Sequence, residues 1–133
     1  MPFVLVDSNV MLDVIQRSDW SRWSEAALRD AADRSQLLIN VVIYAEISVR
    51  FDSKEVVDSA LPAFVIRDPI PYAAGFLAAK VFLQYRRAGG NRSSPLPDFF
   101  IGAHAAVAGY RLLTRDPARY RTYFPKLELI APD

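Results

Sequence analysis

The 133-residue sequence contains no cysteine and a single histidine, which excludes a disulfide framework and a thiolate metal site. It also lacks any run of about 18 uncharged apolar residues, so a membrane span is not expected. No basic segment precedes the first apolar residues, so we expect no signal peptide and a cytoplasmic location. What is present, 52% hydrophobic and 23% charged residues, fits one globular domain over residues 1–133.

The net charge is +1, but the charged residues are unevenly distributed. Residues 1–79 hold 7 Lys and Arg against 11 Asp and Glu, whereas residues 80–126 hold 9 against 2. Clustered positive charge suits a polyanion such as RNA, although a solvated basic surface would give the same pattern. Four residues are our candidates for RNA binding: Arg86, Arg87, Arg92 and Arg115.

Short apolar runs alternate with amphipathic patterns along the whole chain. We predict strands at residues 3–6, 37–39, 63–66, 112–114 and 127–130. We predict helices at residues 9–16, 20–34, 40–51, 54–61, 72–87 and 97–107. In the helix over 72–87, the apolar side should consist of Tyr72, Phe76, Ala79 and Leu83. Strands that alternate with helices predict an α/β fold with helices on both faces of a four- to five-stranded parallel sheet.

Four acidic residues can converge at one edge of that sheet, where open parallel sheets bind their ligands. Asp7 and Asp116 follow predicted strands, Glu46 lies in the helix after the second strand, and Asp98 lies in the first turn of a helix. Clustered carboxylates repel one another and need protons or cations to persist. Their hard oxygens favour Mg²⁺ or Mn²⁺. With the basic segment nearby, the pattern indicates metal-dependent hydrolysis of phosphodiester bonds.

Each acid taken singly also has a structural explanation. Asp7 could cap the first helix, Asp98 could complement a helix dipole, and Asp116 before Pro117 could belong to a turn. Glu46 could face solvent. The prediction of a metal site therefore rests on the four acids taken together.

Other polar and aromatic residues are interpreted as structural. Asp68 is assigned to a turn, Asp13 to a position peripheral to the acids, and His104 to packing instead of base catalysis. Trp20 and Trp23 are assigned to the core or an interface instead of a base-stacking platform.

Four segments of the chain resemble the PIN-domain family and, within it, the VapC-type toxins of bacterial toxin–antitoxin pairs. They are VDSNV at 6–10, YAEI at 44–47, LPDFFIGAHA at 96–105 and LTRDPARY at 113–120. The last two segments are the most specific. The only departure is Ser8, where the family often has threonine.

The resemblance implies a three-layer α/β/α sandwich and an endoribonuclease that depends on Mg²⁺ or Mn²⁺. It implies that Asp7, Glu46, Asp98 and Asp116 form the catalytic and metal-binding quartet. Asn9 and Thr114 would orient these carboxylates. It further implies a homodimer, a cognate antitoxin that covers the active site, and products with 5′-phosphate and 3′-hydroxyl ends.

Two alternatives remain open. A PIN-like fold could bind RNA or a protein without cleaving anything. An aspartate after the first strand also serves phosphatases and phosphoaspartyl proteins. Phosphatases of the haloacid-dehalogenase type, however, require a second aspartate at the position where this chain has Asn9.

Overall fold

The fold is built on one sheet of five parallel strands in the order β3-β2-β1-β4-β5. The computed structural model describes residues 2–133. The strands are β1 (Phe3–Val6), β2 (Gln36–Ile39), β3 (Val65–Arg67), β4 (Arg111–Leu113) and β5 (Leu129–Ile130). The side chains of β1 and β2 are almost all apolar and buried on both faces, as in a sheet covered by helices on both sides. The predicted parallel α/β fold is confirmed.

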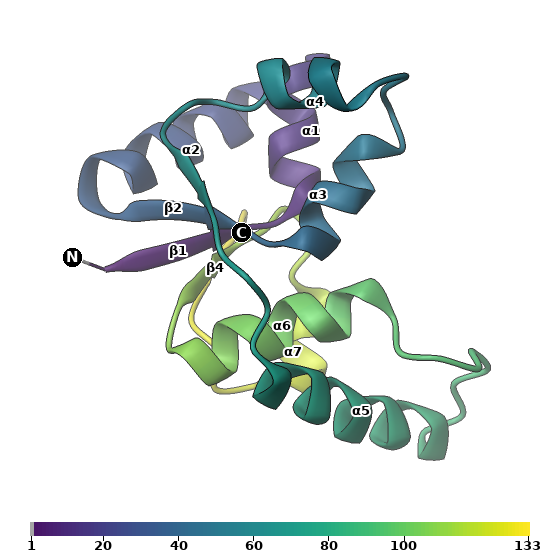
Figure 1. Cartoon of the computed structure of the whole chain (residues 1–133). Helices are drawn as coiled ribbons and strands as arrows, with labels where there is room; N and C mark the ends of the chain where they lie inside the picture. The colour runs from purple at the N-terminus through teal and green to yellow at the C-terminus, as the bar shows by residue number, and fades with distance from the viewer. Residues whose placement is uncertain (1) are drawn as a thin grey trace.

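Over residues 2–133, seven helices connect and cover the strands. They are α1 (Ser8–Gln16), α2 (Ser21–Arg34), α3 (Val41–Ser48), α4 (Lys54–Ala60), α5 (Tyr72–Arg87), α6 (Pro97–Ala108) and α7 (Ala118–Tyr123). Helices α1 and α2 lie on one side of the sheet, and α5, α6 and α7 lie on the other (Figure 1). The molecule therefore has the predicted three layers. Within residues 2–133, no helix has both the length and the apolar character that a membrane crossing requires.

Local sequence signals set the helix boundaries around the sheet edge. Asp7 caps α1 by accepting from the backbone N–H of Ser8, and Asn40 caps α3 by accepting from that of Ile43. Pro97 begins α6, and Gly109 ends it with a φ of 76°, a left-handed conformation that glycine adopts without strain. These caps place the first turns of α1, α3 and α6 at the carboxyl edge of the sheet.

The buried face of α5 differs from the prediction. Ala74, Ala78 and Val81 are its buried residues, whereas the predicted apolar side is exposed, with Tyr72 at 99% exposure. Small side chains allow α5 to approach α6 closely, so the larger side chains are left on the outside. The helix therefore has a second apolar face that the described residues do not cover.

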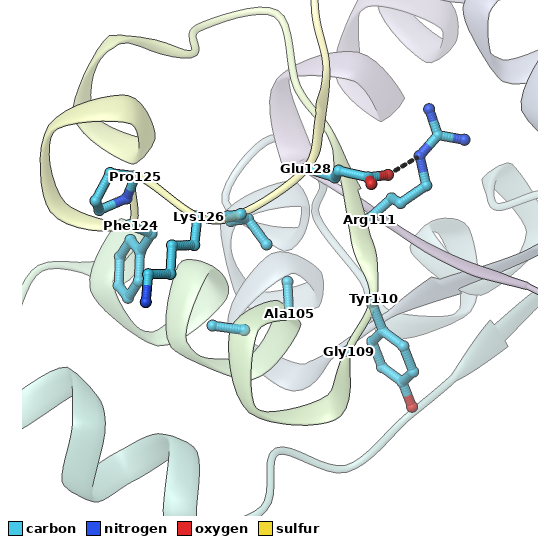
Figure 2. A pocket seen from close by; sticks show the side chains of 10 residues that line it. Ala105, Gly109, Tyr110, Arg111, Phe124, Pro125, Lys126 and Glu128 are labelled. Atoms are coloured by element: carbon cyan, nitrogen blue, oxygen red, sulfur yellow. Dashed lines mark ion pairs between the residues drawn. The ribbon is translucent and has the colours of Figure 1, made fainter.

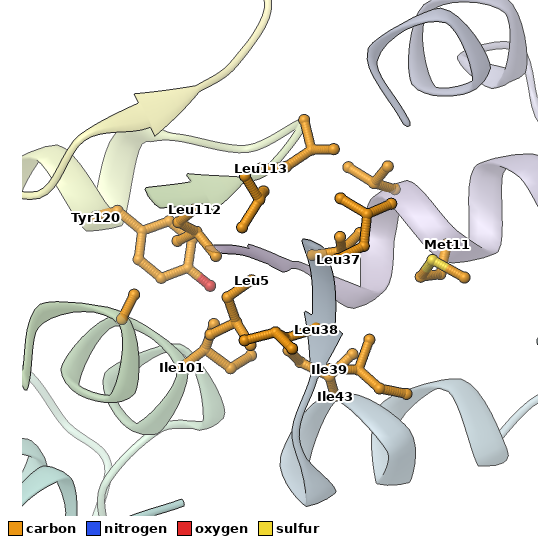
Figure 3. Close-up of a cluster of buried hydrophobic side chains, with 14 of the residues drawn as sticks. Leu5, Met11, Leu37, Leu38, Ile39, Ile43, Ile101, Leu112, Leu113 and Tyr120 are labelled. Atoms are coloured by element: carbon orange, nitrogen blue, oxygen red, sulfur yellow. The ribbon is translucent and has the colours of Figure 1, made fainter. Parts of the chain in front are cut away.

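The core lies between the sheet and its helices. Leu5 of β1 and Leu112 of β4 are register partners, and both are fully buried. They pack near Ile101 of α6 and Tyr120 of α7 (Figure 3). Tyr120 links this core to the acidic edge of the sheet, because its ring is buried while its hydroxyl reaches Asp7.

Candidate active site

Three acidic residues lie at the carboxyl edge of the sheet, where they are linked through the side chains of Ser8 and Tyr120. Asp7 follows β1, and its backbone N–H donates to the carbonyl of Leu113 at the end of β4, at 2.9 Å. The hydroxyl of Ser8 donates to Glu46 Oε1 of α3 at 2.9 Å. The hydroxyl of Tyr120 lies 2.9 Å from Asp7 Oδ2 and 3.4 Å from Asp98 Oδ1 in the first turn of α6. The structure thus gathers three of the four predicted acids.

Asp7 is buried and still surrounded by donors. Its Oδ1 accepts from the backbone N–H of Ser8 at 2.8 Å, and its Oδ2 accepts from the Thr114 hydroxyl at 2.8 Å. Burial raises the pKa of Asp7 to about 6, and the charges of Asp98 and Glu46 add to that rise. The hydrogen bonds from Thr114 and Tyr120 lower this pKa and so oppose the effect of burial.

The electrostatic crowding extends to Glu46. Burial raises the pKa of Glu46, the hydrogen bond from Ser8 lowers it, and the charge of Asp98 raises it again. The charge of Asp98 therefore destabilises the charged forms of Asp7 and Glu46. A cation bound among them would relieve that repulsion.

Asp116 lies farther out than the other three acids. Its carboxylate is mostly exposed, and the link to the cluster runs through Asn9, whose Nδ2 is 3.4 Å from Asp116 Oδ2. Asn9 Nδ2 also lies 3.4 Å from Thr114 Oγ1 and 3.5 Å from Asp7 Oδ2. Asn9 Oδ1 accepts from the backbone N–H of Arg115 at 3.1 Å, which fixes the loop after β4. Asn9 and Thr114 thus connect Asp7 to Asp116.

The side chains fit a divalent cation in their chemistry. No three of the His, Cys, Asp and Glu side chains within residues 2–133 are close enough together to hold an ion as a ready-made group. Mg²⁺, however, keeps several waters and is usually held by one or two carboxylates. Asp7 and Asp98, joined through the Tyr120 hydroxyl, supply such a pair, and Glu46 is close enough to affect the pKa of Asp7.

Two residues of α7 belong to this site although sequence analysis did not identify them. Arg119 Nη1 lies 3.1 Å from Asp98 Oδ2 at the exposed side of the cluster, and Tyr120 contacts Asp7 from the buried side. Helix α7 itself was not predicted, because six residues are too few to show a helical period. The only available signal was the position of both residues in the segment that resembles the PIN family.

The predicted RNA-binding arginines fall into two groups. Arg86 and Arg87 end α5, and Arg92 lies in the following loop, where all three are exposed. Arg115 differs, because its Nε pairs with Asp13 at 2.8 Å and its guanidinium lies 5.5 Å from the centre of the Trp20 ring. Contact of these arginines with RNA stays a prediction.

Asp13, peripheral to the other acids, is a buried anchor of the fold. Its side chain is buried and accepts from the hydroxyls of Ser18 and Ser24, both at 2.7 Å, besides its ion pair with Arg115. Asp13 stays outside the contacts among the other acids, but it is more than a surface residue, because Ser18, Ser24 and Arg115 converge on its carboxylate. Trp20 is exposed beside this anchor, and Trp23 packs partly against the core.

His104 belongs to a separate buried network on the other side of α3. Its Nδ1 faces Asn40 Nδ2 at 3.0 Å, and its Nε2 lies 3.0 Å from Asp68 Oδ2. The cap fixes the Asn40 amide, because its Oδ1 accepts from Ile43, so His104 Nδ1 accepts and Nε2–H donates to Asp68. The prediction that His104 is a packed residue is confirmed. Asp68 does more than form a turn, since it also accepts from the Tyr110 hydroxyl at 2.9 Å.

A groove of about 530 Å³ opens beside Glu46 between α1 and α3. It is lined by Ser8, Asn9, Leu12, Asp13, Gln16, Ser18, Glu46, Val49, Arg50 and Arg115. A second cavity, of about 550 Å³, lies away from the acids, between α6 and the segment before β5 (Figure 2). The ion pair between Arg111 and Glu128 at 3.2 Å is at its rim. We place the active site at the carboxyl edge of the sheet, where Glu46 lines this groove and a neighbouring pocket is lined by Asp98 and Asp116.

Comparison with known proteins identifies the family. The sequence profile of the PIN domain matches residues 4–125, which is most of the chain. The chain belongs to the PIN-domain family. Among curated protein sequences, none matches this PIN-domain chain.

Solved structures show the same fold at low sequence identity. This PIN domain superposes on VapBC2 from Rickettsia felis, bound to a DNA fragment from its promoter, with a TM-score of 0.74 and 18% identity over 98% of this chain and 99% of that one. For VapBC-1 of nontypeable Haemophilus influenzae the TM-score is 0.72, with 14% identity over 97% of each chain. For a toxin–antitoxin complex from Klebsiella pneumoniae it is 0.68, with 19% identity over 98% of each chain.

The raised pKa of Asp7 predicts how the stability of the cation-free protein depends on pH. The folded-state pKa of about 6 exceeds the unfolded value of 3.8, so folding takes up a proton between these values. The resulting stabilisation, roughly 3 kcal/mol, is fully present below pH 3.8 and is lost as the pH rises through about 6. As the pH falls, the free energy of unfolding of wild type should therefore rise relative to that of Asp7→Asn.

The comparison of these two proteins is needed because His104 acts in the opposite direction. Burial lowers the pKa of His104, so its contribution to stability is lost as the pH falls below about 6.5. His104 is present in both proteins and cancels in the difference. Urea unfolding in EDTA at several pH values measures it. Parallel pH profiles for wild type and Asp7→Asn would contradict the assigned environment of Asp7.

Proposed function

We propose that this PIN domain is a metal-dependent endoribonuclease, a VapC-type toxin that hydrolyses RNA phosphodiester bonds and is neutralised by a cognate antitoxin. The observation that carries the proposal is the placement of Asp7, Glu46 and Asp98 at one sheet edge, where burial and then the neighbouring carboxylate charges raise the pKa of Asp7. Carboxylates that destabilise one another are not needed to bind RNA, so the arrangement favours a cation site over a passive binding module.

Asp7 and Asp98 would hold Mg²⁺ or Mn²⁺, and Glu46 and Asp116 would complete the site. When bound, such a cation neutralises phosphate charge and makes a water molecule more acidic, which is the chemistry that hydrolysis requires. Thr114 donates to Asp7 and fixes the orientation of its carboxylate. Arg119, on the exposed side of Asp98, is placed to contact a phosphate of the substrate by charge-assisted hydrogen bonds.

The test is incubation of antitoxin-free protein with total cellular RNA and Mg²⁺ or Mn²⁺, with EDTA as the control. We expect discrete cleavage products with 5′-phosphate and 3′-hydroxyl ends, all absent in EDTA. Products with 2′,3′-cyclic phosphate would overturn the proposed hydrolysis. RNA binding without cleavage would favour the binding module, and rapid turnover of small phosphomonoesters would favour a phosphatase.

The groove beside Glu46 is our proposed site for a segment of the antitoxin. Val49 lines it and is 81% exposed although it is apolar, and the exposed Trp20 lies against Arg115, another lining residue. A segment laid there would reach Glu46 and cover the acids. In co-expression with the antitoxin, Val49→Asp should remain folded but fail to form the complex in gel filtration; an intact complex would move the binding surface elsewhere.

The exposed face of α5 is our proposed homodimer contact. Tyr72, Phe76 and Leu83 form one apolar stripe along the helix, and a helix face can pair with its own copy about a two-fold axis. Phe76→Asp places a charge on this stripe without disturbing the buried face of α5. Light scattering should report a dimer for wild type and a monomer for Phe76→Asp. A dimer in both would exclude this face.

A further inference from the structure

We propose that Tyr120 is a positioning residue of the cation site. Its hydroxyl donates to one carboxylate oxygen of Asp7 and so leaves the other oxygen available to a cation. The inference rests on the proposed function and deepens it. The inference concerns helix α7, which contains none of the four acids.

Tyr120 is held in place by its buried ring and by its helix. The residue is 1% exposed, and its ring lies in the core near Leu112 with the hydroxyl oxygen directed inward (Figure 3). The backbone N–H of Phe124 donates to the Tyr120 carbonyl at 2.8 Å, and Phe124 is itself buried. A ring held in this way gives its hydroxyl little freedom to move, so the hydroxyl can act as a fixed donor.

The donors around Asp7 are unequally shared between its two oxygens. Oδ2 accepts from Thr114 at 2.8 Å and from Tyr120 at 2.9 Å, which uses its two lone-pair directions, and Asn9 Nδ2 lies beside it at 3.5 Å. Oδ1 accepts only the backbone N–H of Ser8 at 2.8 Å and keeps one direction open. We therefore assign cation binding to Oδ1 of Asp7. Tyr120 and Thr114 are the residues that enforce this choice.

The same hydroxyl also lies beside the second carboxylate. It lies 3.4 Å from Asp98 Oδ1, whereas Asp98 Oδ2 faces Arg119 at 3.1 Å. A phenol has one proton, which the shorter distance assigns to Asp7. Without the hydroxyl, Asp7 Oδ2 would lose a donor, and its carboxylate could rotate about its broad terminal torsion. The two acids would then no longer be oriented together before a cation binds.

Tyr120→Phe tests this role because it removes only the hydroxyl and keeps the buried ring. We expect Mn²⁺ to bind Tyr120→Phe about 10- to 100-fold more weakly than wild type in titration calorimetry, with an unchanged circular dichroism spectrum. Tyr123→Phe is the matched control, since Tyr123 lies on the same helix and its ring packs against Phe99 at 5.3 Å. Its affinity for Mn²⁺ should equal that of wild type.

A double-mutant cycle separates positioning from packing. In an Asp7→Asn background, Tyr120→Phe should cause little further loss of Mn²⁺ affinity, because the carboxylate that Tyr120 orients is gone. Unchanged Mn²⁺ affinity in folded Tyr120→Phe, or equal losses in both backgrounds, would overturn the positioning role. Failure of wild type itself to bind Mn²⁺ would instead overturn the proposed metal-dependent function, and the role of Tyr120 with it.

Discussion

Asp98→Asn is expected to cleave RNA at least about 100-fold more slowly than wild type while resisting urea as well as wild type or better. Cation-assisted catalysis contributes several kcal/mol to the transition state, and each 1.4 kcal/mol corresponds to about a tenfold change in rate. In the cation-free protein the substitution removes a charge that raises the pKa of both Asp7 and Glu46. The loss of the partly exposed ion pair with Arg119 should cost little, because such pairs contribute about 0–1 kcal/mol.

Asp98→Asn should thus lose cleavage activity without losing stability, and few other substitutions would give both results. Cleavage of total RNA in Mg²⁺ and urea unfolding in EDTA measure them on the same preparation. Asp30→Asn is the control, because Asp30 is an exposed acid of α2 that pairs with Arg34 at 3.3 Å, and it should change neither quantity. Equal cleavage by wild type and Asp98→Asn would indicate a contaminating nuclease or a wrong site. If Asp98→Asn lost both stability and cleavage, Asp98 would be a structural residue.

The location of the acids could be predicted because it depends on topology more than on side-chain detail. Parallel strands bring their carboxyl ends to one edge, so Asp7 after β1 and the first turns of α3 and α6 had to meet there. The caps at Asp7 and Asn40 are likewise local signals that four or five residues carry. Asp116 shows the limit of this reasoning, since following a strand places it at the correct edge but not in contact with the other carboxylates.

Features that depend on tertiary packing could not be predicted. Helix α5 carries two apolar faces, and the sequence pattern does not say which one packs against α6; the structure buries the alanines. Helix α7 is too short for a period, so Tyr120 could not be placed near Asp7, 113 positions earlier in the chain. The burial of Asp13 depends on Ser18, Ser24 and Arg115 arriving from separate elements.

Arg115→Met is expected to lower the free energy of unfolding by about 3 kcal/mol, because it leaves the buried Asp13 carboxylate without its cationic partner. The hydroxyls of Ser18 and Ser24 still donate to Asp13, and Arg115 is partly exposed, so we expect the low end of the range for broken buried pairs. Denaturant unfolding in EDTA measures this loss. The partner variant Arg115→Met/Asp13→Asn should recover part of it, because a neutral amide needs no counter-ion.

The same pair of variants separates the two roles open to Arg115. As an anchor it ties α1 to the loop that carries Asp116, since Arg115 Nε binds Asp13 and its backbone N–H donates to Asn9. As an RNA contact it would act through charge alone. Partial recovery of stability and of cleavage in the double variant would establish the anchor. Arg115→Met with wild-type stability but weaker RNA binding that the second substitution does not restore would assign Arg115 to the RNA, and Asp13 would then contribute little to folding.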